Sequence, residues 1–249
     1  MKTKNIYNSI EELKLELYKI QCKNWIPSKS KGTGAAGITL EKLLHKDEDQ
    51  FILPDYSGIE LKTKIEGSEP YISLFSMAFD NKPLEIRRLL KIGGYPDKKN
   101  PQFKVFQIAV YGNSKKFVRG NLTYQLKVDY SQQVLRLIIL DYHCQLIDNS
   151  MSWSFSQLQS RLEHKMNYVA FIPVKKWYIN ETIYFRYLDA KFFQLKGFEI
   201  FLKLIEEGII RVTFRISYFK DEERFGNIHD RGTTFEIRED DLTKLFDEI

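Results

Sequence analysis

The chain has 249 residues, 43% of them hydrophobic and 29% charged, and these ordinary proportions exclude a disordered chain. Its 38 Lys and Arg residues exceed its 33 Asp and Glu residues by only five, so the net charge of +5 favours a polyanionic partner weakly. No apolar run approaches the roughly 20 residues that cross a bilayer. The N-terminus lacks the apolar core of a signal peptide, and the two cysteines lack metal-ligand spacing. These features predict a cytoplasmic protein without a membrane partner.

The first third of the chain predicts two helices followed by a tightly turned pair of strands. A capping-box pattern at residues 9–12 begins the first helix, whose apolar stripe continues to Ile20. A polar stretch with three glycines, residues 28–37, leads into the second helix. Strands are expected at residues 51–53 and 59–65, joined by a turn at residues 54–58. A short helix over residues 84–90 should end at two glycines.

In the rest of the chain, predicted strands alternate with predicted helices. Apolar runs predict strands at residues 103–111, 122–130, 134–141, 168–174, 209–219 and 233–238. Helical periodicity predicts helices at residues 155–166, 195–207 and from Asp240 onward. The fold class is therefore expected to be α/β.

The strongest chemical signal lies in residues 54–62. Side chains alternate along a strand, so Glu60 and Lys62 share one face while Leu61 lies on the other. Asp55 precedes the strand across a tight turn and can reach the same place. Two converging carboxylates suit a hard divalent cation, and a neighbouring lysine can position water and offset phosphate charge. Charged hairpins often produce such a string by chance, so its context decides its meaning.

Glu41 is the second unusual residue. It follows Ile38 by three positions and precedes Leu44 by three, which places it on or beside the apolar face of its helix. Burying a lone carboxylate is costly, so this one must be paired, hydrogen-bonded or bound to metal. From periodicity alone, a salt bridge to a lysine at the edge of the core is slightly favoured over an active-site role.

Taken together, these residues resemble a known family. The segments Lys31-Gly32-Thr33-Gly34, Glu41, Pro54-Asp55 and Glu60-Leu61-Lys62 are similar to the nuclease core of the MvaI/BcnI group of type II restriction endonucleases. That group is itself similar to the mismatch-repair nicking enzyme MutH, within the PD-(D/E)XK nucleases. The likeness continues at Ser152-Trp153-Ser154-Phe155 and at Ile228-His229-Asp230-Arg231-Gly232-Thr233. It spans about residues 28–238.

The resemblance implies both an architecture and a catalytic set. A PD-(D/E)XK nuclease core, with a mixed β-sheet flanked by helices, would occupy a catalytic lobe at residues 1–175. A DNA-recognition lobe would follow at residues 176–249. Asp55 and Glu60 would bind Mg²⁺ together with the Leu61 carbonyl, and Lys62 would act on the attacking water. Glu41 matches the family's helix acid, which now favours an active-site role.

The segment from Arg211 to Arg238 holds the residues expected to contact DNA bases. Guanine presents two acceptors that suit arginine, and cytosine presents a donor that suits a carboxylate. Arg215 and Arg231 are therefore candidates for guanine, and Asp230 for cytosine. His229 and Glu236 complete the DNA-binding candidates in this segment. The alternative is that Asp230 and Arg231 only shape a turn before Gly232.

The remaining DNA contacts are expected at phosphates, and one departure limits the base assignment. Lys29 and Lys31 would touch phosphates, which position a duplex without reading it, as would the basic residues at 115–119. Family members carry an acid where this chain has Thr213, and some carry Arg in place of Glu236. The resemblance therefore implies a short site with G·C pairs and leaves its sequence open.

The function implied is sequence-specific, Mg²⁺-dependent cleavage of double-stranded DNA by a chain acting as a monomer. A cognate DNA methyltransferase would be its genetic partner. A MutH-like repair nickase and a non-catalytic DNA-binding module are the alternatives. The simultaneous presence of Glu41, Asp55, Glu60 and Lys62 counts against the module. The long recognition-like segment, without an obvious docking tail, favours restriction over repair.

Overall fold

The structure, a computed structural model, describes residues 5–44, 54–118 and 121–249. The strand expected at residues 51–53 lies outside these ranges. The chain divides into two compact units: Met1–Ile72, Arg161–Lys196 and Leu242–Ile249 form the first, and Ser73–Ser160 with Gly197–Asp241 form the second. Each unit is assembled from segments far apart in sequence. Their boundaries therefore differ from the single boundary expected after residue 175, because strand pairing joins distant segments of the chain.

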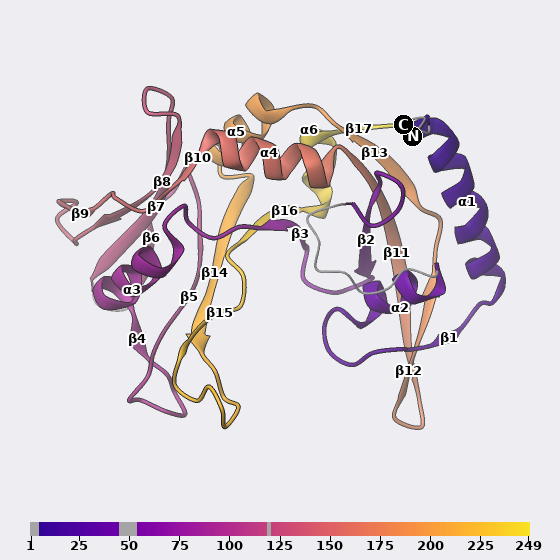
Figure 1. Cartoon of the computed structure of the whole chain (residues 1–249), viewed down its shortest axis with the longest axis horizontal. Helices are drawn as coiled ribbons and strands as arrows, with labels where there is room; N and C mark the ends of the chain where they lie inside the picture. Colours follow the sequence, from indigo (N-terminus) through magenta and orange to yellow (C-terminus); the bar gives the residue numbers. More distant parts are fainter. Residues whose placement is uncertain (1–4, 45–53, 119–120) are drawn as a thin grey trace. The chain divides into compact units, whose positions relative to one another are not determined.

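The first unit is built on a mixed sheet around the long strand β11 (Tyr168–Ile179) (Figure 1). β11 pairs in parallel with β2 (Glu60–Ile65) and antiparallel with β12 (Thr182–Tyr187) and β13 (Lys191–Leu195). The outer strands are β1 (Ile26–Pro27), beside β12, and β17 (Phe246–Glu248), beside β13. The short helix α6 (Leu242–Leu245) precedes β17. The mixed α/β fold expected from the sequence is confirmed.

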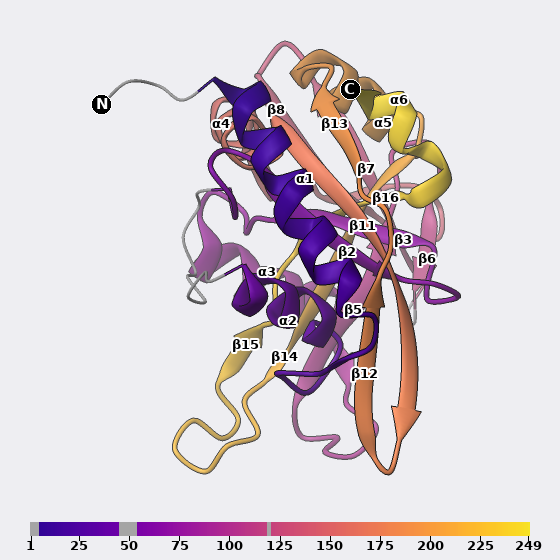
Figure 2. The ribbon, with the colours of Figure 1, turned by 90° about the vertical axis from the view of Figure 1, so that its right-hand side faces the viewer.

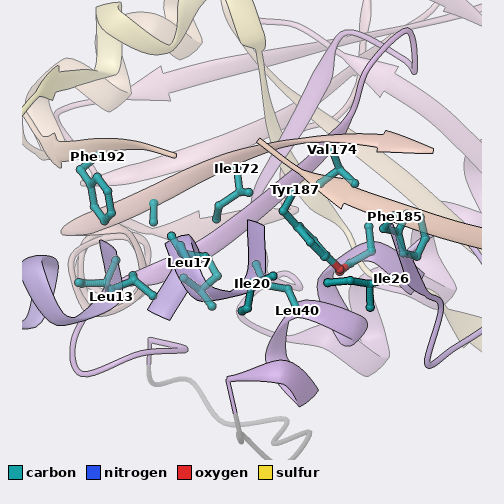
Figure 3. Packing of buried hydrophobic residues seen from close by; sticks show 14 of the residues in the cluster. Leu13, Leu17, Ile20, Ile26, Leu40, Ile172, Val174, Phe185, Tyr187 and Phe192 are labelled. Atoms are coloured by element: carbon teal, nitrogen blue, oxygen red, sulfur yellow. The ribbon is translucent and has the colours of Figure 1, made fainter. Parts of the chain in front are cut away.

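Two helices cover one face of this sheet. Figure 2 shows α1 (Ile6–Cys22) lying along the sheet, and Figure 3 shows its residues packed against β11 and β12 together with those of α2 (Ala35–Leu43). Leu13 and Leu40 are fully buried there. The Tyr187 hydroxyl donates a hydrogen bond of 2.8 Å to the Ala36 carbonyl, which fastens α2 to the sheet.

The beginning of α1 differs from the prediction. Its N-cap is Asn5, whose side chain accepts a hydrogen bond of 3.2 Å from the Tyr7 amide. Ser9, the predicted cap, lies inside the helix and is buried. The capping box was therefore wrong by one turn, because Asn5 satisfies the free amides first.

The sheet of the first unit also contains strands that the sequence pattern missed. β11 continues five residues past the predicted end at residue 174 and returns as β12 through a two-residue turn. Asn180 (φ 45°) and Glu181 (φ 64°) form this turn, and positive φ at both positions suits the twist of a hairpin. The predicted C-terminal helix is only a 3₁₀ turn (Glu239–Asp241) followed by α6, because β17 then pairs with β13.

The second unit contains two sheets. The first has the order β3 (Tyr71–Ser76), β16 (Thr234–Arg238), β14 (Ile210–Tyr218), β5 (Lys104–Val110), β4 (Tyr95–Pro96), with β15 (Ile228–Asp230) beside β14. The second has the order β10 (Ser152–Ser154), β8 (Val134–Leu140), β7 (Leu122–Asp129), β6 (Lys116–Val118), with β9 (Leu146–Asp148) beside β8.

The second unit also contains helices and an aromatic core. α3 (Lys82–Gly93) and α5 (Phe198–Glu206) belong to the second unit, and α4 (Phe155–Met166) runs from the second unit into the first. Trp153 is fully buried and packs on Phe79 with ring centroids 4.4 Å apart, as expected of a core residue. None of the helices in the described ranges is long and apolar enough to cross a membrane.

Candidate functional site

A two-residue turn positions Asp55. Tyr56 and Ile59 exchange both backbone hydrogen bonds, each at 2.8 Å. Ser57 (φ 44°) and Gly58 (φ 91°) lie between them, and positive φ at both positions is typical of a type I′ turn. The chain therefore reverses immediately after Asp55. Asp55 Oδ2 then accepts a hydrogen bond of 3.0 Å from the Leu61 amide of β2.

Glu60 and Lys62 follow on one face of β2. Lys62 Nζ donates a hydrogen bond of 2.8 Å to Glu60 Oε1, and the Glu60 side chain is only 3% exposed. Ile59 and Leu61 are buried in the core against α1 and α2, which fixes the strand from the other face. The structure thus brings Asp55, Glu60, Leu61 and Lys62 together.

A second lysine joins this group. Lys165, in the last turn of α4, places its Nζ 3.3 Å from Glu60 Oε2, with 21% of its side chain exposed. Lys165 is not among the site residues predicted from the sequence. A signal was present, because Leu158, Leu162 and Lys165 follow the i, i+4, i+7 spacing of one helix face. A lysine on the apolar face of a helix needs a buried partner, because burying an unpaired charge is costly, as it is for Glu41.

The environment of Glu60 is unfavourable for its charge. Burial raises the pKa of Glu60 above its ordinary value, and the nearby Asp55 charge raises it further, although Lys62 and Lys165 act in the opposite direction. Glu60 Oε2 is buried and accepts no hydrogen bond, although Lys165 Nζ lies 3.3 Å away. A cation bound to this oxygen would compensate the buried charge.

The donor set fits a divalent metal ion. Asp55 and Glu60 supply carboxylates. The Leu61 amide donates to Asp55, and because the amide and carbonyl of one strand residue point to the same edge, the Leu61 carbonyl shares that edge. Across the described ranges, no three His, Cys, Asp or Glu side chains gather as a metal site. A metal held here would therefore rely on two carboxylates, backbone oxygen and water, as Mg²⁺ commonly does.

Glu41 lies in the same unit beside a different part of β2. A Cβ built on Gly37 would lie 3.8 Å from Glu41 Oε1 and 3.5 Å from Thr63 Oγ1, so both side chains flank Gly37. Thr63 alternates with Lys62 and belongs to the α2 side of the strand. Tyr187 has its pKa raised mainly by burial and also by the Glu41 charge. An active-site role for Glu41 stays a prediction.

In the second unit, Glu236 is a buried anchor for arginine. Its Oε2 accepts hydrogen bonds from Arg211 Nε at 2.9 Å and from the Thr213 hydroxyl at 2.7 Å, and its Oε1 accepts one from Arg215. Only 5% of the Glu236 side chain is exposed, against 47% for Arg215. Glu236 therefore orients Arg215, and the Arg215 guanidinium is the group that reaches solvent.

The predicted base readers lie next to one another, Arg215 on β14 and Arg231 directly after β15. The Arg231 amide donates a hydrogen bond of 3.1 Å to the Arg215 carbonyl. Asp230 Oδ1 accepts a hydrogen bond of 2.9 Å from the Gly232 amide, where φ is +105°, and Asp230 Oδ2 lies 3.5 Å from Lys82 Nζ. Asp230 thus shapes the turn before Gly232. This is the structural role that the sequence offered as the alternative to a base contact.

His229 is held by a stack that the sequence did not indicate. Its ring lies parallel to that of Phe219, with centroids 4.0 Å apart and an interplanar angle of 8°. The Arg224 guanidinium carbon lies 3.9 Å from the centroid of the Phe219 ring. A cavity of about 600 Å³ adjoins Phe219, His229 and Asp230. The histidine therefore has a fixed ring plane beside an open space.

The expected phosphate contacts lie at the beginning of α2. Lys29 and Lys31 are exposed on the loop before the helix. The Lys29 amide donates to the Thr39 hydroxyl at 3.0 Å, so the loop is tied to α2. Of the second basic cluster, Lys115 is exposed and residues 119 and 120 lie outside the described ranges.

Comparison with known proteins identifies the family. Residues 14–246 match the MvaI/BcnI restriction endonuclease family. The solved structure described as restriction endonuclease MvaI in complex with cognate DNA substrate is 30% identical, covers 96% of each chain and has a TM-score of 0.87. The structure of restriction endonuclease MvaI in the absence of DNA is 27% identical, with coverage of 100% and 99% and a TM-score of 0.62. Among curated proteins none matches. The chain therefore belongs to the MvaI/BcnI restriction endonuclease family and is a site-specific DNA nuclease.

Proposed function

We propose that this chain hydrolyses phosphodiester bonds of double-stranded DNA at a short site containing G·C pairs, and that it requires Mg²⁺. The observation that carries the proposal is Glu60, a buried carboxylate with one oxygen lacking a hydrogen bond, placed beside Asp55 and Lys62. Such an acid costs stability and serves the fold poorly. It fits a cation site in a nuclease, and the DNA-bound MvaI structure supports duplex DNA as the substrate.

Each residue of the site has a distinct task in this proposal. Asp55 and Glu60 hold Mg²⁺ with the Leu61 carbonyl. When bound, the metal lowers the pKa of a coordinated water and offsets phosphate charge. Lys62, held at 2.8 Å by Glu60, orients the attacking water. Lys165 balances the second Glu60 oxygen, and Glu41 acts from α2 as the helix acid.

Base reading is assigned to the second unit. Arg215 and Arg231 donate to guanine, with Arg215 held by the buried Glu236. His229 and Asp230 complete the reading surface. The family's acid at position 213 is a threonine here, and its hydroxyl bonds to a carboxylate supplied by Glu236 from the neighbouring strand. We therefore expect a recognition sequence that differs from those of relatives carrying that acid.

The cellular setting follows from this activity. The enzyme acts as a monomer in the cytoplasm, and a DNA methyltransferase of matching specificity protects the host. A MutH-like nickase remains the second candidate, because the nuclease motif is common to both groups. The two differ in product, since a restriction enzyme converts plasmid to linear fragments and a nickase leaves open circles.

Cleavage of a sequenced plasmid with Mg²⁺, followed by sequencing of the ends, tests the proposal. Discrete linear fragments with one shared terminal sequence are expected, and a chelator should abolish them. Asp55→Ala and Lys62→Ala should each lower the rate at least about a hundredfold. Lys203→Ala, an exposed lysine on α5, is the matched control. Undiminished cleavage by either site variant would refute the assigned site, and a smear would refute site specificity.

A further inference from the structure

We propose that a groove in the first unit binds backbone phosphates of the DNA flanking the cleavage site, an inference that rests on the proposed function. The groove has a volume of about 610 Å³. Its walls come from the loop before α2, the end of β2, the β2–β3 turn and the β11–β12 hairpin. Its lining residues include Thr33, Thr63, Lys64, Glu69, Lys176 and Tyr178. We call it the flank groove.

Two ammonium groups line the flank groove, Lys64 from β2 and Lys176 from the β11–β12 hairpin. Lys64 Nζ lies 3.4 Å from the Tyr71 carbonyl, a long hydrogen bond that leaves its other protons available. Lys176 Nζ lies 4.7 Å from the centroid of the Tyr178 ring, and both residues line the groove. Glu69 is the carboxylate in the lining, and Thr33 and Thr63 add hydroxyl groups. Ammonium and hydroxyl donors of this kind bind phosphate oxygens.

The position of the groove points to DNA as its occupant. Lys64 follows Lys62 by two residues on β2, a separation of about 7 Å along a strand. A DNA strand carries a phosphate about every 3.4 Å of helix axis. A duplex with its scissile phosphate at Lys62 therefore presents further phosphates within reach of Lys64. The volume also far exceeds the roughly 30 Å³ of a single water.

Lys203 provides the matched control for Lys176. Both side chains are exposed, and Lys203, on α5 of the second unit, is not among the residues that line the flank groove. Lys175, the neighbour of Lys176, is unsuitable, because Pro173 pairs with Lys64 and Lys175 therefore shares the sheet face of Lys62 and Lys64. Variants of Lys176 and Lys203 change the net charge equally and differ in whether the flank groove loses it.

Binding of a duplex containing the cleavage site, measured by fluorescence anisotropy without Mg²⁺ at several salt concentrations, separates the two lysines. Lys176→Gln should weaken binding several-fold and lower the slope of log K against log salt by about one. Lys203→Gln should leave the slope unchanged. Glu69→Gln should act in the opposite direction and strengthen binding, because a carboxylate repels phosphate. Equal effects of the two lysine variants, or weaker binding by Glu69→Gln, would overturn the inference.

Replacing single phosphates of the duplex by neutral methylphosphonates locates the contact. One or two flanking positions should weaken wild-type binding and leave Lys176→Gln binding unaffected, because the same contact is already lost. If the loss of affinity from each methylphosphonate adds to the loss from Lys176→Gln at every position, Lys176 contacts none of these phosphates. The DNA would then lie outside the flank groove. Cleavage of the unmodified duplex by the wild-type enzyme tests the proposed function separately, so a failed groove and a failed nuclease give different results.

Discussion

Glu60 connects the fold to the chemistry at the scale of a single residue. Strand alternation turns it away from the core that holds Leu61, yet its side chain remains 3% exposed. Its raised pKa reflects this burial first, and the two lysines compensate the charge only in part. A residue placed this way costs folding stability, as functional groups often do.

Glu60→Gln should separate metal binding from stability. Without metal, the variant should unfold at the same or a higher temperature, because a neutral amide costs less to bury than a carboxylate. Mg²⁺ should raise the melting temperature of the wild type, since a ligand at 100 times its Kd adds about 2.7 kcal/mol, and should leave the variant unchanged. Thermal unfolding with and without Mg²⁺ checks this. An equal Mg²⁺ shift in both proteins would show that the metal binds elsewhere.

The stack of Phe219 on His229 leads to a prediction about specificity. Phe219→Leu should free the histidine ring and lower the ratio of cleavage at the correct site to cleavage at one-mismatch sites. A drop of about threefold to tenfold is expected from the energy of an aromatic pair. Phe225→Leu is the control, because Phe225 contacts Phe103 and Tyr218. An unchanged ratio in Phe219→Leu would show that the stack does not position a base reader.

At the scale of elements, the turn at Ser57 and Gly58 decides where Asp55 lies. Positive φ at both residues reverses the chain in two residues, and the same reversal makes the Asp55 to Leu61 hydrogen bond possible. The sequence predicted this turn from Pro54 and Gly58. It did not predict the β11–β12 hairpin, because Lys175 and Lys176 interrupt the apolar run that marks the first part of β11.

Gly58→Ala tests the importance of that turn against a matched glycine. Gly58 and Gly67 both have positive φ and room for a Cβ, so alanine at either position should destabilise the fold by about 1 kcal/mol. Cleavage should fall about tenfold or more for Gly58→Ala, because a small displacement of Asp55 is costly. Gly67→Ala should keep its rate. Urea unfolding measures the loss of stability and plasmid cleavage measures the rate. Equal cleavage rates for Gly58→Ala and Gly67→Ala would show that the turn at Gly58 does not matter for catalysis.

At the scale of the whole molecule, the proposed catalytic residues Asp55, Glu60 and Lys62 lie together within one unit of the chain. A duplex has two strands of opposite polarity, so a monomer must cut them in separate events. The proposed recognition residues belong to the other unit. Under the proposal, cleavage and base reading would therefore rest on separate hydrophobic cores.

A monomer should pass through a nicked intermediate. In a plasmid time course with enzyme below the plasmid concentration, open circles should accumulate before linear DNA. Analytical ultracentrifugation with a duplex carrying one site should show one chain per duplex. Direct conversion to linear DNA with two chains per duplex would contradict monomeric action. Open circles that never become linear would favour the nickase.

The sequence by itself determined the α/β class, most helices and the local catalytic string, because alternation and turn chemistry depend on neighbouring residues. The resemblance to the MvaI/BcnI family, which the comparisons confirm, also rested on short segments. Only the tertiary structure decided which distant groups meet. Lys165 reaches Glu60 from α4, and Glu236 on β16 reaches Thr213 and Arg215 on the neighbouring strand β14, because such contacts depend on how the elements pack. The two units likewise combine segments from both halves of the chain, which no local pattern encodes.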